Sequence, residues 1–444
     1  MKKNIIVIGG GILGIFCALY FKKKNKNVTL IEQNNKIGGL FNSIESKNRI
    51  FYDHGCHFAR ETGVKKIDRL LFNFIDEREW RILGNLKYRG FYKSKLSKSF
   101  GALDARLLKK KDYLRSIKEF LRIKKLKNNY KNLSTQLVNT FGNTITEKIF
   151  KPIIEDKITG IKLDKLPKNF HKWAGMGRLI MFSENLTNEL KKRDVFDQRI
   201  AYHNTEHGQS KLRNFYPKNK GMGYWINLLE KKLIKLNVNI IKGHKIRKIV
   251  DKNNKINHVV LENGKKIECS KLIWTVHPGL LPIKKKITTK ENKDMKKIYL
   301  YLFHFAFNKK LIPDAHFIQC YDPKFKTYRV TLYPNIRNKK DKYYNLTSEL
   351  IFSKKKNISK LKKIAIKELI KIGIIKKNYK LKDSILQELG KGIPVPSIEN
   401  LKNINKLNTK YRKRFKNMVL LNLDPLISTG QNLINTFNFL NKND

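Results

Sequence analysis

The chain has 444 residues, of which 41% are hydrophobic, so it is long enough to bury a large core and to form two domains. Its formal net charge is +60, from 96 Lys and Arg against 36 Asp and Glu, which favours anionic ligands. The basic residues are spread over every segment, so compositional bias explains most of the excess. Without a clustered basic groove or a known nucleic-acid motif, we expect no specific nucleic-acid partner.

The four cysteines lie far apart and show no metal-ligand spacing; they are Cys17, Cys56, Cys269 and Cys320. We therefore expect reduced thiols in a cytoplasmic protein, and no metal site. The charge also suits the inner surface of an anionic membrane, on which the protein would lie peripherally.

The first 32 residues carry the strongest signal. An apolar run, Ile5–Ile8, leads into the glycine-rich turn Gly9–Gly14, and a second apolar run, Val28–Ile31, ends at Glu32. This order of strand, glycine turn, helix, strand and acid is typical of a dinucleotide-binding unit.

Each residue of the motif has a physical role. Gly9 allows a sharp turn out of the strand, Gly11 lets a pyrophosphate approach the backbone, and Gly14 lets the helix pack close to the sheet. The helix N-terminus offers N–H groups and a partial positive charge to the phosphates. Glu32 follows Gly14 by 18 residues, where an acid accepts hydrogen bonds from a ribose.

A second interpretation of the same segment is a signal peptide or membrane anchor, because three residues, Met1-Lys2-Lys3, precede an apolar stretch. The glycines at motif spacing and the following Lys22-Lys23-Lys24, in place of a cleavage site, argue against it. No other long uncharged apolar run occurs, so we expect no membrane-spanning helix.

The pattern of the remaining residues predicts two excursions, that is, two segments in which the chain leaves this dinucleotide-binding unit and then returns to it. The first half gives a hairpin at 44–52, a helix over 63–74, short strands within 79–100, mainly helix over 104–192 and a loop over 193–214. A helix follows Gly223, and then strands are expected at 238–241, 246–250, 256–261, 266–269 and 272–276. The second excursion is predicted to hold strands 298–307, 316–321, 327–333 and 344–352 and helix 358–372, before strand 418–423 and helix 431–441.

With these residues in order, the chain resembles the superfamily of FAD-dependent amine oxidases and protoporphyrinogen oxidases, and in particular its UDP-galactopyranose mutase branch. The matching features are the glycine motif with Glu32, the pair Gly38-Gly39, the stretch Asp53–His57, the segment Tyr216–Gly223 and a C-terminal strand, turn and helix.

The resemblance implies an α/β fold with a Rossmann-like FAD-binding domain (GR2-type flavoprotein fold) into which a discontinuous α+β substrate domain is inserted. It places the FAD-binding domain at residues 1–85, 215–284 and 396–444, and the substrate or cap domain at 86–214 and 285–395.

The resemblance also implies the cofactor contacts. Gly9, Gly11 and Gly14 would meet the FAD pyrophosphate, Glu32 the adenosine ribose, and Gly38 and Gly39 the pyrophosphate or the flavin end. Ile246 would offer its backbone to the adenine, and the turn at Asp424 would approach the isoalloxazine. Two positions depart from the family: Leu40 stands for the usual arginine, and Leu423 for the glycine before Asp424.

His57 is the candidate catalytic residue, because the histidine of the corresponding mutase segment lies near the flavin. A histidine that merely satisfies a turn is an equal alternative. Arg60 and Arg178 are interpreted as solvated surface charges. Aromatic residues on expected strands could form a wall near the flavin, although core packing explains most of them; they are Tyr88, Tyr92, Tyr299, Tyr301 and Tyr333.

Three functions remain open. The first is an FAD-dependent oxidoreductase that removes a hydride from a C–N or C–C bond, compatible with bacterial surface-polysaccharide synthesis. The second is a non-redox flavoenzyme that acts on a nucleotide sugar or other glycoconjugate. The third is a basic binding protein without catalysis. Nicotinamide as the sole dinucleotide is less favoured than FAD because of Gly38-Gly39 and the C-terminal return.

Overall fold

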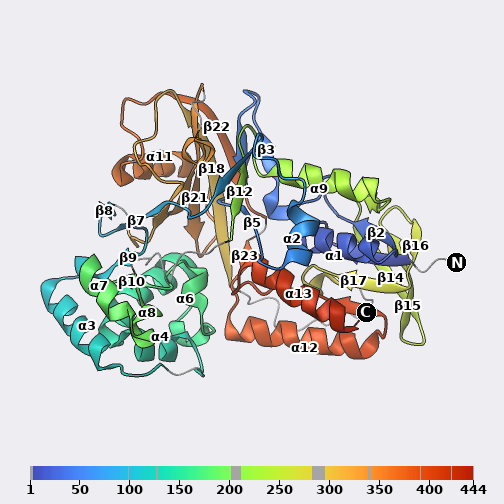
Figure 1. The fold of residues 1–444 in the computed structure, drawn as a ribbon, viewed down its shortest axis with the longest axis horizontal. Coiled ribbons are helices and arrows are strands. Elements are labelled where there is room, and N and C mark those ends of the chain that lie inside the picture. Colours follow the sequence, from blue (N-terminus) through green and yellow to red (C-terminus); the bar gives the residue numbers. More distant parts are fainter. Residues whose placement is uncertain are drawn as a thin grey trace.

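The structure is a computed structural model that describes residues 4–98, 100–126, 129–201, 212–282, 296–338, 342–390, 392–421 and 423–443. It has three lobes (Figure 1). A dinucleotide-binding lobe, on the right in Figure 1, contains both ends of the chain; a helical lobe and a lobe built on a large sheet lie on the left.

The dinucleotide-binding lobe is built on a five-stranded parallel sheet in the order β13-β2-β1-β17-β24. The strands are β1 (Asn4–Ile8), β2 (Asn27–Ile31), β13 (Asn239–Ile241), β17 (Lys271–Trp274) and β24 (Met418–Leu420). Because they come from three separated stretches, the sheet is completed only when the chain returns twice. The expected α/β Rossmann-like fold is confirmed, although β24 is shorter than the predicted strand.

Both faces of this sheet are covered, which explains why its strands are continuous apolar runs. One face packs against α1 (Ile12–Lys23), α2 (Lys65–Phe72), α9 (Gly223–Lys235) and α13 (Thr429–Asn443). The other packs against α12 (Ile398–Arg414) and an antiparallel sheet of β14 (Ile246–Lys252), β15 (Lys255–Leu261) and β16 (Lys266–Glu268). Helix α12 was not predicted, because its Lys- and Asn-rich sequence has little apolar periodicity.

The helical lobe surrounds its own apolar core. Its elements include α3 (Lys110–Arg122), α4 (Leu133–Phe141), α5 (Asn143–Ile145), π-helical turns over Thr146–Phe150 and Pro152–Thr159, α6 (Phe170–Trp173), α7 (Glu184–Lys191) and α8 (Asp194–Asp197). A small parallel sheet joins β9 (Leu103–Asp104), β10 (Leu179–Ile180) and β11 (Ile200–Ala201).

The loop predicted over 193–214 is wrong in part. The segment contains α8 and β11, and β12 (Asn214–Pro217) begins at its end, while residues 202–211 lie outside the described part. One residue of this polar segment, Arg199, is buried. It is 0% exposed, and its guanidinium lies 3.9 Å from the Phe120 ring centroid. A cation packed on an aromatic face in this way orders a segment that has little apolar periodicity.

The third lobe is an eight-stranded sheet in the order β22-β18-β21-β20-β19-β7-β8, with β23 beside β18. Its strands are β7 (Tyr88–Tyr92), β8 (Lys95–Leu96), β18 (Lys297–Phe307), β19 (Phe317–Cys320), β20 (Thr327–Leu332), β21 (Tyr344–Phe352), β22 (Leu381–Glu388) and β23 (Ile393–Pro394). Helix α11 (Leu361–Ile372) covers one face with an apolar core, and the short helix α10 (Tyr333–Arg337) follows β20. Strand β22 was not predicted.

A buried lysine ties the helical lobe to this sheet. Lys157 is 4% exposed, and its Nζ donates to the carbonyl oxygens of Cys320 at 2.6 Å, Thr327 at 2.8 Å and Asp322 at 3.0 Å. Burial lowers the pKa of this amine. Its three acceptors all belong to β19, β20 and the turn between them, so the helical lobe is fixed against the sheet edge.

Asp53 joins the separated parts of the dinucleotide-binding lobe. It ends β4 (Phe51–Asp53), which pairs with β3 (Ser43–Glu45). Its buried carboxylate accepts hydrogen bonds from Tyr216 Oη at 2.6 Å, Ser43 Oγ at 2.7 Å and the Met222 N–H at 2.8 Å. One carboxylate therefore joins the segment that precedes the first excursion to the segment that follows it.

Gly221 makes room for this arrangement. A Cβ built on Gly221 would overlap Ser43 Oγ and lie 2.6 Å from Asp53 Oδ1. The glycine of the Tyr216–Gly223 segment is thus required by close packing against Asp53.

We predict that Gly221→Ala lowers the free energy of unfolding by roughly 2 kcal/mol, because the new methyl group must displace Ser43 or the carboxylate. Urea denaturation measures this change. Gly84→Ala is the matched control, since a Cβ there meets no atom within 4 Å, and its effect should stay within about 0.5 kcal/mol. Equal effects of the two substitutions would contradict the packing role of Gly221.

Candidate functional site

The glycine turn lies at the carboxyl end of β1, where parallel α/β sheets bind their ligands. Gly9 has φ +99° and a Cβ on it would lie 2.7 Å from Thr275 Oγ1. A Cβ on Gly14 would overlap the Gly9 carbonyl oxygen, so α1 can pack this closely only with glycine there. These placements agree with the roles inferred from the sequence.

The passage in front of α1 is open. A Cβ on Gly11 would meet no atom within 4 Å, and Gly11 caps α1 without a side-chain hydrogen bond. The first turn of α1 holds no acidic residue, so its N–H groups and dipole face this space. Gly39 lies directly against Gly11, because a Cβ on Gly39 would be 3.7 Å from Gly11 Cα.

Gly38 is hydrogen-bonded directly to the glycine turn. Its N–H donates to the Gly10 carbonyl at 2.6 Å, and its φ of +112° strongly favours glycine. A Cβ at Gly38 would lie 2.7 Å from Ile226. The paired glycines therefore bring a second stretch of backbone beside the glycine turn.

Glu32 lies at the end of β2, beside this turn. Its Oε2 accepts from the Gly10 N–H at 2.7 Å, and its Oε1 accepts from the Asn34 N–H at 2.9 Å and Asn34 Nδ2 at 2.8 Å. The carboxylate is thus oriented by the protein, and a carboxylate oxygen can accept a further hydrogen bond from a ribose hydroxyl.

Ile246 begins β14 close to Glu32. The preceding residues connect the two, because the Gly243 N–H donates to the Asn34 carbonyl at 3.0 Å and the His244 N–H to the Glu32 carbonyl at 3.3 Å. The structure therefore places the backbone predicted to meet the adenine next to the acid predicted to meet its ribose.

Asp424 lies in the turn before α13. Its N–H donates to Asn432 Oδ1 at 2.8 Å, and its Oδ1 accepts from the Leu426 N–H at 2.9 Å, so it shapes the turn before α13. It lines a pocket of about 580 Å³ with Thr275 and His277, among others. The N-terminus of α13 approaches Thr62, since a Cβ on Gly430 would be 4.0 Å from its methyl group.

His57 lies between the glycine passage and the large sheet. Its ring centroid is 5.4 Å from that of Phe41, and its Nε2 is 3.2 Å from the His54 carbonyl oxygen. Burial, with a contribution from the Arg329 cation, lowers the pKa of His57 to about 3. The imidazole is therefore neutral at ordinary pH, and donation from Nε2 to the carbonyl leaves Nδ1 as an acceptor.

The face of the large sheet turned away from α11 is polar. Strand register aligns Gln319, Arg329 and Glu349 in one row that continues to Gln387. The neighbouring row contains Thr331, Thr347 and His304. The segment Asp53–His57 lies against this face: a Cβ on Gly55 would be 3.3 Å from Glu349 Oε1 and 3.5 Å from Arg329 Nη2.

Arg329 and Glu349 form a buried two-point ion pair. Nε donates to Glu349 Oε1 at 2.7 Å and Nη2 to Oε2 at 3.1 Å. The side chain of Glu349 is 3% exposed and that of Arg329 is 24% exposed. Glu349 thus holds the guanidinium in one orientation, and part of the Arg329 side chain stays exposed.

A chain of hydrogen bonds runs from His54 across the sheet. His54 Nδ1 contacts Gln387 Oε1 at 2.9 Å, and the same oxygen lies 3.3 Å from His304 Nε2. His304 Nδ1 bonds Thr347 Oγ1 at 2.8 Å, which in turn bonds Tyr333 Oη at 2.6 Å. Sequence reasoning named Tyr333 only as an aromatic residue, and it missed Gln387, His304 and Thr347 because only strand register brings them together.

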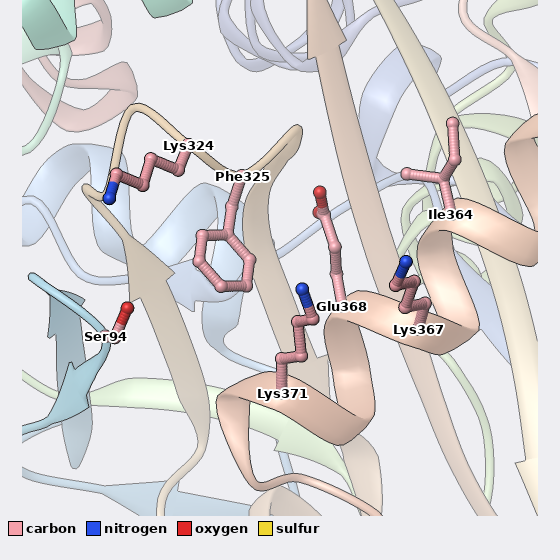
Figure 2. Close-up of a pocket in the computed structure, with 7 residues that line it drawn as sticks. All are labelled: Ser94, Lys324, Phe325, Ile364, Lys367, Glu368 and Lys371. Atoms are coloured by element: carbon pink, nitrogen blue, oxygen red, sulfur yellow. The ribbon is translucent and has the colours of Figure 1, made fainter.

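Figure 2 shows a pocket beside α11, near the β19–β20 turn, whose lining includes Phe325 and three lysines, Lys324, Lys367 and Lys371. The buried Glu368 beside them accepts from the Thr327 N–H and Oγ1, both at 2.7 Å, so it serves the β20 backbone. This pocket borders the α11 face and does not include the polar face that meets His57.

The comparisons with known proteins agree with this geometry. Residues 7–76 match a family described as an NAD(P)-binding Rossmann-like domain. A 4,4'-diaponeurosporene oxygenase of Staphylococcus aureus is 52% identical over 46 residues, which are 10% of this chain and 9% of that protein.

Solved structures match over nearly the whole chain at low identity. A reduced UDP-galactopyranose mutase has a TM-score of 0.74 and 17% identity over 93% of this chain and 87% of its own. An Exiguobacterium protein described as a putative protoporphyrinogen oxidase gives 0.69 and 14% over 99% of both chains. A putrescine oxidase variant gives 0.60 and 10% over 100% of both chains.

The chain has the GR2-type flavoprotein fold. At these identities the likeness of the solved structures concerns the fold, and the family match covers residues 7–76, which contain the glycine motif. The predicted fold class and the resemblance to flavoproteins are thus confirmed, while the domain boundaries and the site residues remain predictions.

Within the described ranges, no group of three or more His, Cys, Asp or Glu side chains could hold a metal ion. The same ranges contain no helix long and apolar enough to cross a membrane. The arrangement instead provides an uncapped helix N-terminus, an oriented acid and open backbone, which fit a dinucleotide.

We predict that Gly11→Val weakens dinucleotide binding at least tenfold, because the side chain would fill the space in front of α1. Its backbone, at φ −69° and ψ 175°, accepts any residue, so stability without FAD should change by no more than about 0.5 kcal/mol. Equilibrium titration with FAD and urea denaturation measure the two effects. Unchanged affinity would show that the dinucleotide does not pass Gly11.

The lowered pKa of His57 predicts how the free energy of unfolding changes with pH. Unfolded His57 binds a proton below about pH 6.5, whereas the folded imidazole stays neutral to about pH 3, so its burial costs stability as the pH falls through this window. His57→Gln removes this cost. Between pH 6.5 and 5 we expect wild type to lose about 1–2 kcal/mol relative to the variant in urea denaturation. Parallel pH profiles would contradict a buried, neutral His57.

Proposed function

We propose that this protein is an FAD-dependent oxidoreductase. The observation that carries the proposal is one continuous arrangement: the oriented Glu32, the open space in front of Gly11, and the polar sheet face that begins at His57. A dinucleotide bound along this line would place its adenosine end at Glu32 and its redox-active end between two lobes, where a substrate can reach it.

The residues present fit FAD. Glu32 would accept hydrogen bonds from the adenosine ribose, Ile246 would offer backbone to the adenine, and Gly9, Gly11 and Gly14 would allow the pyrophosphate to approach α1. Gly38 and Gly39 would line the path toward the flavin, and the turn from Asp424 to α13 would supply N–H groups near its ring. Bound FAD would supply a hydride acceptor: the substrate would lose the hydride of a C–H bond and a proton from the neighbouring N or C, so that its C–N or C–C single bond becomes a double bond.

The protein's own contribution is orientation. His57 is neutral, so it would position substrate or cofactor through hydrogen bonds and would not donate a proton at neutral pH. Arg329, held by Glu349, presents a fixed cation beside it. An anionic or strongly polar substrate group would be stabilised there.

The cation at Arg329 also supports a second candidate, a non-redox flavoenzyme that acts on an anionic glycoconjugate such as a nucleotide sugar. The two candidates differ in whether electrons leave the bound flavin with each turnover. They share the cofactor and the site, so one experiment separates them.

We predict that a substrate bleaches the flavin absorbance of the FAD-loaded protein under anaerobic conditions, and that an acceptor such as oxygen restores it. Stopped-flow absorbance with amines, porphyrinogens and nucleotide sugars provides the test. A nucleotide sugar that isomerises only when the flavin is reduced beforehand, with no net use of reductant, would instead establish the non-redox candidate.

A further inference from the structure

The pocket of Figure 2 lies on the side of the large sheet that α11 covers, and the polar face that meets His57 is on the other side. Its volume is about 560 Å³, within the range of small-molecule sites. The β19–β20 turn and the β7–β8 turn each contribute to its wall. Four lining residues share one face of α11, because they are spaced three and four residues apart; they are Ile364, Lys367, Glu368 and Lys371.

The polar groups that remain available in this pocket are hydrogen-bond donors. The side chains of Lys324, Lys367 and Lys371 are exposed, and none of them forms an ion pair with a carboxylate in the described part of the chain. Ser94, on the β7–β8 turn, lines the same pocket, and its hydroxyl has no hydrogen-bond partner among the residues that the structure describes. Three ammonium groups and one hydroxyl are therefore free to bind a ligand.

The carboxylate of Glu368 does not neutralise these cations. It is 8% exposed, and its Oε1 accepts from the Lys326 N–H at 2.9 Å. Its Oε2 accepts from the Thr327 N–H and from Thr327 Oγ1, both at 2.7 Å. The acid on the pocket face of α11 is thus used by the backbone at the start of β20.

A second carboxylate, that of Asp322, joins the two turns of the pocket. It is 3% exposed, and it accepts from the Lys324 N–H at 3.0 Å and from the Ser94 N–H at 2.9 Å. Lys157 of the helical lobe holds the same turn through the carbonyl oxygens of Asp322 and Thr327. The pocket wall is therefore held in place by the protein itself, which lowers the cost of ordering it around a ligand.

This arrangement differs from an ordinary basic surface. Three exposed lysines alone would not distinguish a site in a chain with 96 Lys and Arg. Here both nearby carboxylates bind backbone N–H groups, so the positive charge in the pocket is not compensated. Phosphate oxygens accept several charge-assisted hydrogen bonds at once, and more than one cation favours a ligand with at least two negative charges.

We propose that this pocket is a second ligand site, separate from the flavin site, which binds a compound that carries a phosphate or diphosphate group. Lys324, Lys367 and Lys371 bind the anion, Ser94 Oγ donates to it, and Ile364 contacts the remainder of the ligand. The site lies on the other face of the sheet from His57, so it does not depend on the proposed function. A soluble phosphorylated compound and the headgroup of a phospholipid both have this chemistry.

Calorimetric titration with inorganic pyrophosphate at low ionic strength tests the proposal. Saturating FAD is included, so that pyrophosphate does not occupy the passage in front of α1. Wild type should bind one pyrophosphate per chain with a dissociation constant below about 1 mM, and more tightly than it binds inorganic phosphate. Flavin absorbance recorded on the same samples reports on the FAD site separately.

Two double variants with the same net charge locate the binding. The pocket variant, Lys367→Gln with Lys371→Gln, should bind pyrophosphate at least tenfold more weakly, because two of the three ammonium groups are lost. The control variant, Lys362→Gln with Lys363→Gln, changes exposed lysines of α11 that do not line the pocket, and should change affinity less than twofold. Replacing Lys367 and Lys371 by arginine keeps the charge and should keep affinity within about threefold.

Vesicles of phosphatidylcholine with and without phosphatidic acid separate the two sources. If the pocket variant sediments with phosphatidic acid vesicles less than the control variant does, the ligand is a lipid headgroup. Equal sedimentation, together with the loss of pyrophosphate affinity, identifies a soluble phosphorylated compound. The proposal is overturned if wild type binds neither probe, or if the pocket variant binds both as tightly as the control variant does.

Discussion

The arrangement of the whole molecule depends on the buried carboxylate of Asp53. Its three hydrogen bonds join β3 to β12 and to the start of α9, which lie more than 160 residues further along the chain. Its backbone N–H donates to Tyr333 Oη at 2.9 Å, which adds the large sheet to the same junction. Such a buried group is stabilising only while every partner is present. The junction therefore fixes the segment that carries His57.

With that segment fixed, the polar face of the large sheet becomes the floor of the site. On the β22 side its residues are hydrogen-bonded to one another through His304 and Gln387. The side chain of Arg329 is more exposed to solvent. The helical lobe, tied on by Lys157, closes the β7 side. The three lobes thus meet at one polar surface, as expected of a fold that binds cofactor and substrate in different domains.

The sequence predicted what local geometry dictates and missed what register dictates. The glycine turn and Glu32 could be predicted from the sequence, because each residue meets a steric or hydrogen-bonding requirement set by the strand–turn–helix motif itself. The role of Arg329 could not be predicted, because it is one of 96 basic residues and only the strand register brings Glu349 opposite it. The paired glycines were expected to approach the cofactor, and Gly38 also proves to be needed for packing on Ile226.

The central claim is that the chain binds FAD along the passage in front of α1. Titration of the purified protein with FAD, followed by difference absorbance and then dithionite, tests it most directly. The account predicts perturbed flavin bands that bleach on reduction, and no displacement by excess NAD⁺. Unperturbed flavin bands, together with tight binding of NAD⁺, would contradict it and identify a nicotinamide protein in a flavoprotein fold.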